Sequence, residues 1–420
     1  MINHRGMLQR LWHSPYLRQS SFYSGAQMGA QIVLGMGQIW ALANYLPRES
    51  YGWWGYCAGI TGLVSIFTLP GMGQMITYGA ARQMDGVLWA GVRIRLRFGI
   101  LATLLLLAIA VWHRQTGQET VFFMLLLAAL FLPAQLALDS MDAYLHGAGL
   151  FRALFFRRLL AQGILALAIA VAAWSTGSVL ICALLLYGGG LLITLLLFLT
   201  LLPKRRNHLL PDDFLSLSRQ FSLQSIGTAI GYNMERPLLS RFISFEEMAA
   251  YNLALAAQLA VGIGRLVDRI LISRLANPRC GVEVSQVRWG MQLLFILGAT
   301  GYLLLSLLLS WLLPMLLPHY GDALPLIYIL LLQMPFAWAN SLGMSWLLAR
   351  PEHHPYYHRV TWLIMTLRIL LLTAGAFLAA SRGVAWAWVL LEAGQFLAVY
   401  LLLHHTAVAD DCPPDSKDER

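Results

Sequence analysis

The sequence predicts an all-α polytopic membrane protein with about twelve transmembrane helices in two pseudo-symmetric six-helix bundles. Three observations support this prediction. Hydrophobic residues make up 58% of the 420 residues and charged residues 12%, whereas soluble domains carry about 25% charged residues. The apolar residues gather in runs of about twenty, long enough to cross roughly 30 Å of hydrocarbon. Basic residues gather between alternate runs.

The expected spans begin after a polar N-terminal stretch. Residues 1–20 are basic, and the apolar run that follows is too long and too rich in glycine for a cleavable signal peptide. The first, second, seventh and eighth spans are less apolar than the others, so they should face protein or water. Ser175-Thr176-Gly177-Ser178 predicts a tight turn between the fifth and sixth spans. The twelve spans lie near 22–45, 54–79, 96–112, 121–141, 158–175, 178–202, 221–243, 248–274, 290–313, 323–349, 360–380 and 384–404.

The distribution of basic residues tests this topology independently. Most Lys and Arg residues fall in alternate loops, and the other loops hold Arg48, Arg114 and Arg382. This asymmetry places both termini in the cytoplasm. Tryptophans near the span ends predict aromatic belts at the two membrane interfaces. Those at predicted outer ends are Trp53, Trp54, Trp112, Trp174, Trp386 and Trp388, and those at inner ends are Trp12, Trp89, Trp289 and Trp362. The formal net charge of +9 is then explained by anionic lipid headgroups, and no nucleic-acid partner is expected.

The chain reads as two related halves with a spacing of about 197 residues. The turn after the first span and the turn after the seventh span repeat an aromatic, aliphatic, acidic and aromatic order. We expect an N-terminal bundle (1–203), a basic cytoplasmic linker (204–219), a C-terminal bundle (220–405) and a disordered cytoplasmic tail (406–420). Six helices per half makes the repeats parallel, and transporters with such repeats bind substrate between the halves.

Five arginines lie inside the predicted spans. A guanidinium keeps its charge at any ordinary pH, and at the centre of a membrane helix it costs roughly 2.5 to 3.5 kcal/mol to insert. Such groups should therefore line a hydrated cavity that holds an anion, or pair with buried acids. Arg241 and Arg269 lie close enough to span ends to reach the interface. The five are Arg236, Arg241, Arg265, Arg269 and Arg368.

Three segments resemble one family. Residues 43–52 (ANYLPRESYG), residues 69–82 (LPGMGQMITYGAAR) and residues 245–251 (FEEMAAY) are similar to segments of polysaccharide-export flippases. These belong to the polysaccharide transporter family of the multidrug/oligosaccharidyl-lipid/polysaccharide (MOP) exporter superfamily. The resemblance implies an O-antigen-type flippase that moves a polyprenyl-pyrophosphate oligosaccharide across the bacterial inner membrane. It also implies, as partners, membrane lipids and the polymerase and chain-length machinery of surface polysaccharide synthesis.

The predicted substrate would explain the buried arginines. A pyrophosphate cannot cross hydrocarbon without replacement of its hydration shell, and guanidinium groups supply bidentate N–H donors for that purpose. We expect Arg236, Arg265 and Arg368 to line the cavity. Pro237 follows Arg236 and should bend the seventh span there. Glu235, Asp268 and Glu392 are candidates for cation coupling, with Na⁺ or H⁺, or for ion pairs with the arginines. No bound cofactor, metal or catalytic residue is expected.

Other motifs carry weaker interpretations. Asp139 and Asp142 read as solvated helix-end residues or as partners for arginines of the following loop. His353, His354 and His358 have metal-like spacing without an evident fourth ligand, which favours an interfacial loop. Cys57 and Cys182 both fall near the outer face, so a disulfide between them is conceivable. Gly71-Met72-Gly73 reads as a kinked helix, because no strand precedes it as in a phosphate-binding loop.

Three alternatives remain at this stage. A drug or cation antiporter of the same superfamily would share the fold but would need buried acids for its cationic substrates. A membrane-embedded O-antigen polymerase or ligase would need a long outer loop with catalytic residues, and no such constellation is evident. A pure scaffold would have no need for polar helices at its centre.

Overall fold

The computed structural model describes residues 15–200, 207–211, 214–264, 284–349 and 354–411. Within these ranges the regular elements are helices, and no strand occurs. Seven helices are long and apolar enough to cross a membrane, and a bent pair near residues 48–81 makes an eighth. The longest of them covers two predicted spans. The chain is therefore an all-α polytopic membrane protein, as predicted.

The contacts divide the chain into two units, unit 1 (Met1–Ala249) and unit 2 (Ala250–Arg420). The helices of unit 1 are α2 (Pro15–Tyr45), α3 (Arg48–Val64), α4 (Met72–Ala81), α5 (Gly86–Gln115), α6 (Glu119–Leu138), α7 (Ser140–Gly147), α8 (Phe151–Thr176), α9 (Val179–Leu184), α10 (Gly190–Thr200), α11 (Phe214–Asn233) and α12 (Glu235–Leu239). Short turns η1 (Ser65–Thr68) and η2 (Leu185–Gly189) join α3 to α4 and α9 to α10.

Unit 2 begins within a helix. Helix α13 (Phe245–Ala254) crosses the division between the units. The remaining elements are α14 (Ala257–Gly262), α16 (Val284–Leu316), η3 (Pro318–Ala323), α17 (Leu324–Leu331), α18 (Met334–Ala349) and α19 (His354–Asp411).

Each predicted span coincides with helix in the part of the chain that the structure describes, but several spans are broken. The second is bent by 54° between η1 and α4, the fourth breaks between α6 and α7, and the seventh breaks between α11 and α12. The predicted tight turn is confirmed: α8 ends at Thr176 and Gly177 adopts a left-handed conformation with φ of +60°. Glycine pays no Cβ penalty in this conformation.

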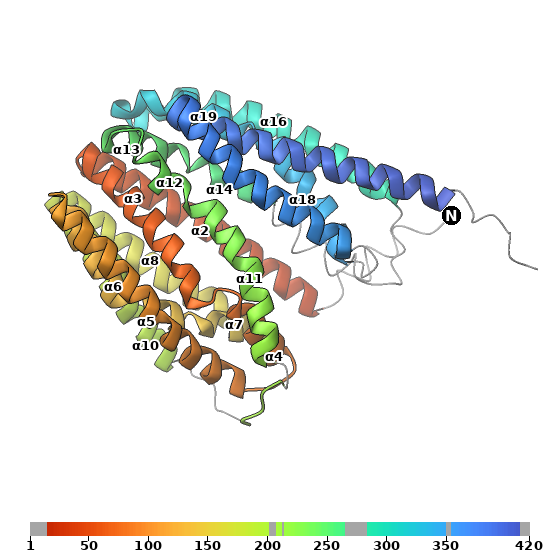
Figure 1. Ribbon diagram of the computed structural model, residues 1–420, viewed down its shortest axis with the longest axis horizontal. Coiled ribbons are helices and arrows are strands. Elements are labelled where there is room, and N and C mark those ends of the chain that lie inside the picture. Colours follow the sequence, from red (N-terminus) through yellow and green to blue (C-terminus); the bar gives the residue numbers. More distant parts are fainter. Residues whose placement is uncertain (1–14, 201–206, 212–213, 265–283, 350–353, 412–420) are drawn as a thin grey trace, which may run out of the picture. The chain divides into compact units, whose positions relative to one another are not determined.

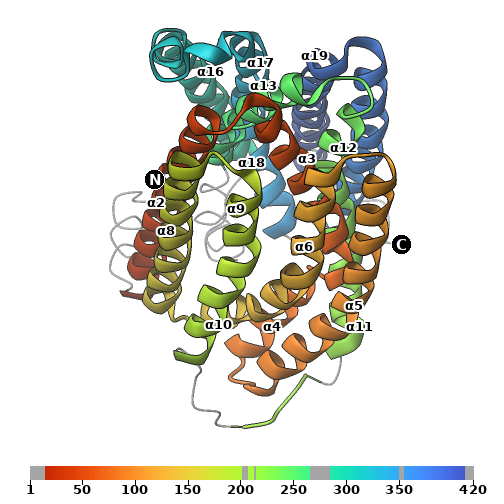
Figure 2. The same cartoon turned by 90° about the vertical axis from the view of Figure 1, so that its left-hand side faces the viewer.

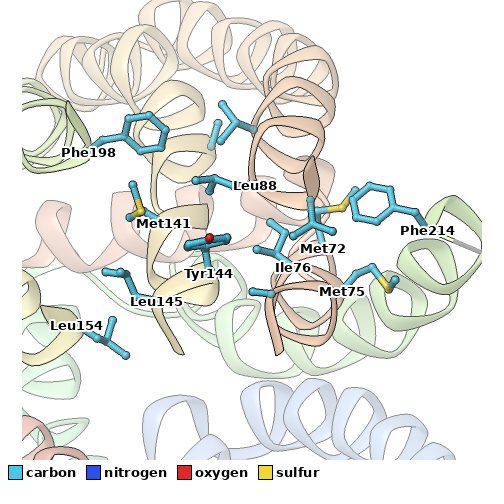
Figure 3. Close-up of a cluster of buried hydrophobic side chains, with 14 residues drawn as sticks. Met72, Met75, Ile76, Leu88, Met141, Tyr144, Leu145, Leu154, Phe198 and Phe214 are labelled. Atoms are coloured by element: carbon cyan, nitrogen blue, oxygen red, sulfur yellow. The ribbon is translucent and has the colours of Figure 1, made fainter. Parts of the chain in front are cut away.

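A core of apolar side chains holds the broken spans of unit 1 together. Figure 3 shows Met72 and Ile76 of α4 facing Leu88 of α5 and Tyr144 of α7. Phe214, at the start of α11, lies against the same cluster. Burial of one such side chain contributes about 1.5 to 3 kcal/mol, so this core stabilises the bend itself.

Helices α11 and α12 pack within unit 1, along α3 and α4 (Figure 1). Figure 2 shows the same unit turned by 90°, and α11 packs there against α4. The sequence repeat nevertheless assigns these two helices to the C-terminal half. The predicted boundary at residues 203–220 stays a prediction about the repeat, because packing groups helices by contact and not by descent.

In unit 2, α19 contains the eleventh and twelfth predicted spans. It turns at Ala379 and Ala380, whose backbone angles are not helical. On either side of this turn, Gly375 and Gly383 approach so closely that a β-carbon on one would overlap the backbone of the other. Small residues allow this kind of contact between membrane helices. A second core, which includes Met291, Trp346 and Val399, joins α19 to α16 and α18.

The predicted aromatic belt is partly corrected by the structure. Trp89, Trp174, Trp289 and Trp386 are well exposed on the protein surface, as lipid-facing belt residues should be. Trp388 was predicted at the outer interface, but it is 2% exposed and lies inside unit 2. Its ring faces a charged residue described below.

The close contact in α19 predicts a specific sensitivity. Gly383→Val should lower the free energy of unfolding by about 1 to 3 kcal/mol, the usual cost of overpacking. Gly394→Val on the same helix is the matched control, because a β-carbon there meets no atom within 4 Å. Thermal unfolding of both variants in detergent would measure the difference. Equal melting temperatures for the two variants would contradict the packing of this hairpin.

Candidate functional site

The break between α11 and α12 places two predicted site residues. Pro237 has no backbone N–H, so it cannot donate to the carbonyl four residues earlier, that of Asn233. Helix α11 ends at Asn233 and α12 starts at Glu235. The Asn233 side chain turns back to donate from Nδ2 to the Ala229 carbonyl over 2.8 Å. The predicted bend at Pro237 is therefore present, with Glu235 and Arg236 at the start of the second segment.

Helix α3 meets this break with glycines. A β-carbon at Gly59 would lie 2.7 Å from Pro237 Cδ and 3.0 Å from Arg236 Cβ. At Gly62 it would overlap the side-chain oxygen of Asn233. The two glycines therefore let α3 and the broken helix approach closely, which leaves no room for larger side chains at this level.

The two charges at the break have different environments. Glu235 is 3% exposed and engaged by the surrounding protein. Arg236 is half-buried, and its Nε atom is buried without a hydrogen-bond partner among the described residues. A buried donor that lacks a partner costs about 1 to 3 kcal/mol. Arg236 therefore retains N–H capacity that an anionic ligand would satisfy.

The bend between η1 and α4 is closed by an arginine that the sequence did not single out. Leu69 has φ of +56° and precedes Pro70, so the helical ladder stops at this point. Arg95 of α5 is buried, and its Nε donates to the Thr68 carbonyl over 3.2 Å. Its Nη1 donates over 3.2 Å to Ser140 Oγ, at the break between α6 and α7. One guanidinium therefore joins two broken helices.

A cluster of charges surrounds the break between α6 and α7. Arg157 of α8 is 4% exposed and forms an ion pair with Asp142, and its Nη2 lies 3.8 Å from Asp139 Oδ1. Arg158 Nε donates to Asp142 Oδ2 over 2.8 Å. The predicted role of Asp139 and Asp142 as partners of nearby arginines is confirmed. Because these acids are occupied by arginines, this cluster has a structural role.

A second polar group lies at the predicted outer end of unit 1. His113 of α5 is 3% exposed and both its ring nitrogens have partners. Nδ1 lies 2.7 Å from Gln118 Oε1, and Nε2 lies 2.9 Å from the Tyr56 hydroxyl of α3. When Nδ1–H donates to Gln118 Oε1, the imidazole is neutral and its Nε2 accepts a hydrogen bond from the Tyr56 hydroxyl. The group fastens α3 to the end of α5.

The two predicted outer turns touch directly within unit 1. Arg48 Nε donates to the Glu246 carbonyl over 3.1 Å, and Gly52 packs against the Phe245 backbone. The Trp53 and Phe245 rings lie 6.3 Å apart, edge to face. We call these five residues the outer-turn contact. They join the turn after the first span to the turn after the seventh.

Unit 2 holds the remaining described candidates on α19. Arg368 is 8% exposed, and its guanidinium carbon lies 4.8 Å from the centroid of the Trp388 ring. A cation over an indole contributes about 2 kcal/mol when desolvated. Glu392 is 9% exposed, and its Oε2 accepts from Asn340 Nδ2 over 3.1 Å. Asn340 also donates to the Glu392 carbonyl over 2.9 Å.

Some predictions fall outside the described residues. Arg265, Asp268 and Arg269 lie there, as does His353. Among the described residues no three His, Cys, Asp or Glu side chains gather as a metal site. Cys57 and Cys182 are buried free thiols, so the conceivable disulfide is not formed. Arg241 is exposed over the Trp112 ring at 5.3 Å, in keeping with its predicted interfacial place.

The double contact of Arg95 predicts that lysine cannot replace it. An ammonium group lacks the planar fork that reaches both Thr68 and Ser140. Arg95→Lys should therefore cost about 1 to 3 kcal/mol of stability, seen as a lower melting temperature in detergent. Arg97→Lys, exposed on the same helix, is the control and should unfold as the unsubstituted protein does. A melting temperature for Arg95→Lys equal to that of the control would show that Arg95 does not seal the breaks.

The fold has known counterparts among solved structures. No protein-family model matches the chain, and no curated protein matches it by sequence. A multidrug resistance MATE family transporter of the MOP superfamily, in an inward-facing conformation, is similar with a TM-score of 0.71. At 13% identity, the match covers 90% of this chain and 95% of that one.

Two further structures extend the likeness. Lipid II flippase MurJ, in an inward closed conformation, has a TM-score of 0.62 at 13% identity, over 92% of this chain and 91% of that one. A third similar structure is a MOP superfamily transporter from Pyrococcus furiosus, described by the reverse polarity of its binding pocket. It has a TM-score of 0.64 at 13% identity, and the match covers 95% of this chain and 96% of that one. The chain therefore has the fold of the MOP superfamily transporters.

Proposed function

We propose that this protein is a flippase, not an enzyme, that moves a polyprenyl-pyrophosphate oligosaccharide across the bacterial inner membrane for O-antigen or related surface polysaccharide synthesis. The observation that carries the proposal is the presence of arginine inside the predicted spans of both units. Arg236 lies at the break of the seventh span and Arg368 is buried in the eleventh. Such fixed cations suit an anionic substrate.

The chemistry of the substrate explains the cost of keeping these groups. A pyrophosphate loses its hydration when it enters a membrane protein, and guanidinium N–H groups replace that water. Arg236 has a buried Nε without a hydrogen-bond partner among described residues. A bound anion would accept a hydrogen bond from this Nε–H group. Arg265, on the eighth predicted span, is proposed as the third member of the site. The polyprenyl chain stays in lipid while the charged headgroup passes through protein.

Movement of the substrate would follow alternating access between the two halves of the repeat. The outer-turn contact joins the first half to the second half at the predicted periplasmic side. We propose that it opens when the substrate site faces the periplasm. Its hydrogen bond is partly exposed, since Arg48 is half-buried and Glu246 exposed, so water can replace it when the two turns separate. Both termini would lie in the cytoplasm, where the linker is also placed.

The acids near the arginines supply a means of coupling. Glu235 is buried and directly precedes Arg236 in the sequence. Glu392 is also buried and accepts a hydrogen bond from Asn340. We propose that Glu235, Glu392 and Asp268 bind Na⁺ or H⁺ or pair with the arginines during the cycle. No bound cofactor is required. The polymerase and chain-length machinery would receive the translocated product.

A second candidate function is favoured by the same acids. A multidrug antiporter binds cationic substrates, for which buried carboxylates such as Glu235 and Glu392 are the natural partners. The similar solved structures include MATE multidrug transporters as well as a lipid II flippase. The transporter described by a pocket of reverse polarity supports the view that this fold accepts pockets of either charge. The arginines decide our preference for the anionic substrate.

Substitution of the three arginines tests the proposal in cells that lack their own flippase. Arg236→Ala, Arg265→Ala and Arg368→Ala should each lower surface polysaccharide about tenfold or more, because a hydrogen bond to a charged group contributes about 1.5 to 3 kcal/mol. Lysine at each position should restore little, since it cannot bind bidentately. The measurement is the polysaccharide ladder from whole cells, normalised to the amount of monodisperse protein.

The matched control for this test is Arg241→Ala, an exposed arginine near the predicted outer interface. It should leave export unchanged. Normal export by all three alanine variants, at equal amounts of folded protein, would rule out an arginine-lined anion site.

A further inference from the structure

A cavity of about 360 Å³ lies in unit 1, away from the breaks and charges described above. It is formed between the first turns of α5 and the short segment 207–211, which belongs to the predicted linker between the halves. The residues that line it are Gly86, Trp89, Ala90, Arg93, His208 and Leu210.

The wall made by the linker segment is held in place by one side chain. Asn207 Nδ2 donates to the Gln83 carbonyl over 2.8 Å. Its Oδ1 accepts from the Asp85 N–H over 3.0 Å and from the Leu209 N–H over 3.2 Å. Two of these hydrogen bonds fasten the segment to the turn before α5, and the third, from Leu209, holds the segment's own backbone in a turn.

Gly86 lets the two walls meet. A β-carbon there would lie 2.6 Å from the Leu209 carbonyl oxygen and 2.7 Å from the His208 carbonyl oxygen. Any larger residue would push the segment away from α5. The absence of a side chain at Gly86 therefore allows the backbone of the linker segment to lie directly against the start of α5.

The cavity combines cationic and apolar walls. Arg93 and His208 are exposed, and neither forms an ion pair with another described residue. Trp89 and Leu210 are 38% and 45% exposed. Among the described residues, Asp85 precedes the lining residue Gly86 and accepts a hydrogen bond from the Tyr144 hydroxyl over 2.6 Å. Among the residues that line the cavity, the Arg93 guanidinium supplies a fixed positive charge.

This combination matches the headgroup region of a phospholipid. An exposed tryptophan beside basic residues is typical of the membrane interface, and the basic loops place the start of α5 at the cytoplasmic leaflet. That leaflet carries anionic lipids, and each nearby basic residue adds about 1 kcal/mol of attraction. We propose that the cavity binds the phosphodiester of an anionic phospholipid through Arg93 and His208, with an acyl chain along Trp89 and Leu210.

The bound lipid would have a consequence beyond anchoring. The segment 207–211 lies in the linker that joins the two halves of the repeat, and the lipid would bridge this segment to α5. It would therefore stabilise unit 1 and hold the start of the linker during the transport cycle. This inference does not depend on the identity of the transported substrate.

The test uses the purified full chain in nanodiscs of phosphatidylcholine, with or without phosphatidylglycerol. Phosphatidylglycerol should raise the melting temperature of the unsubstituted protein and of Arg97→Gln, an exposed control on the same helix. The double variant Arg93→Gln/His208→Gln should lose this increase. Native mass spectrometry should likewise find at least tenfold less retained phosphatidylglycerol on the double variant than on Arg97→Gln.

Two further arms separate the alternatives. Leu210→Glu adds a carboxylate to the cavity without removing a described hydrogen bond, and it should also abolish the phosphatidylglycerol effect. Inorganic phosphate added to phosphatidylcholine nanodiscs should give no increase. The proposal is overturned if either variant responds to phosphatidylglycerol as Arg97→Gln does, or if inorganic phosphate alone reproduces the stabilisation.

Discussion

The structure of unit 1 depends on how it satisfies the backbone groups that become free where membrane helices break. Hydrocarbon offers no hydrogen bonds, so each interrupted helix needs a partner from the protein. Arg95 donates to the Thr68 carbonyl at the bend after η1 and to the Ser140 hydroxyl at the break before α7. Arg157 and Arg158 neutralise the adjoining acids. These breaks are closed by the protein itself.

The break between α11 and α12 differs in that respect. Glycines of α3 pack against it, and Arg236 stands beside it with a buried Nε that lacks a hydrogen-bond partner among the described residues. At this break Arg236 therefore keeps a donor that no described residue uses. In unit 2, Arg368 is fixed against Trp388, so its charge has a defined position. A cation held in a fixed position can bind an anion with little rearrangement, which is the role that we propose for Arg368.

Local patterns predicted much of this fold. Apolar runs gave the helices, Pro237 gave the bend at α12, and Gly177 gave the turn between α8 and α9. The roles of Arg95 and His113 were not predicted, because the partners through which they join other elements, Thr68, Ser140 and Tyr56, lie 27 to 57 residues away in the sequence. Arg95 also falls near a span end, where the basic residues were all interpreted as interfacial anchors. Trp388 was misplaced for the same reason: position along a span does not reveal which face of the helix is buried.

The most direct test of the central claim is transport by the purified protein in liposomes. A fluorescent polyprenyl-pyrophosphate oligosaccharide in one leaflet would be followed by its accessibility to a membrane-impermeant quencher, and a cationic dye would be followed in parallel vesicles under Na⁺ and H⁺ gradients. Our account predicts translocation of the oligosaccharide lipid, with no gradient-driven movement of the dye. Gradient-driven export of the dye without translocation of the oligosaccharide lipid would contradict it and would identify a cation antiporter.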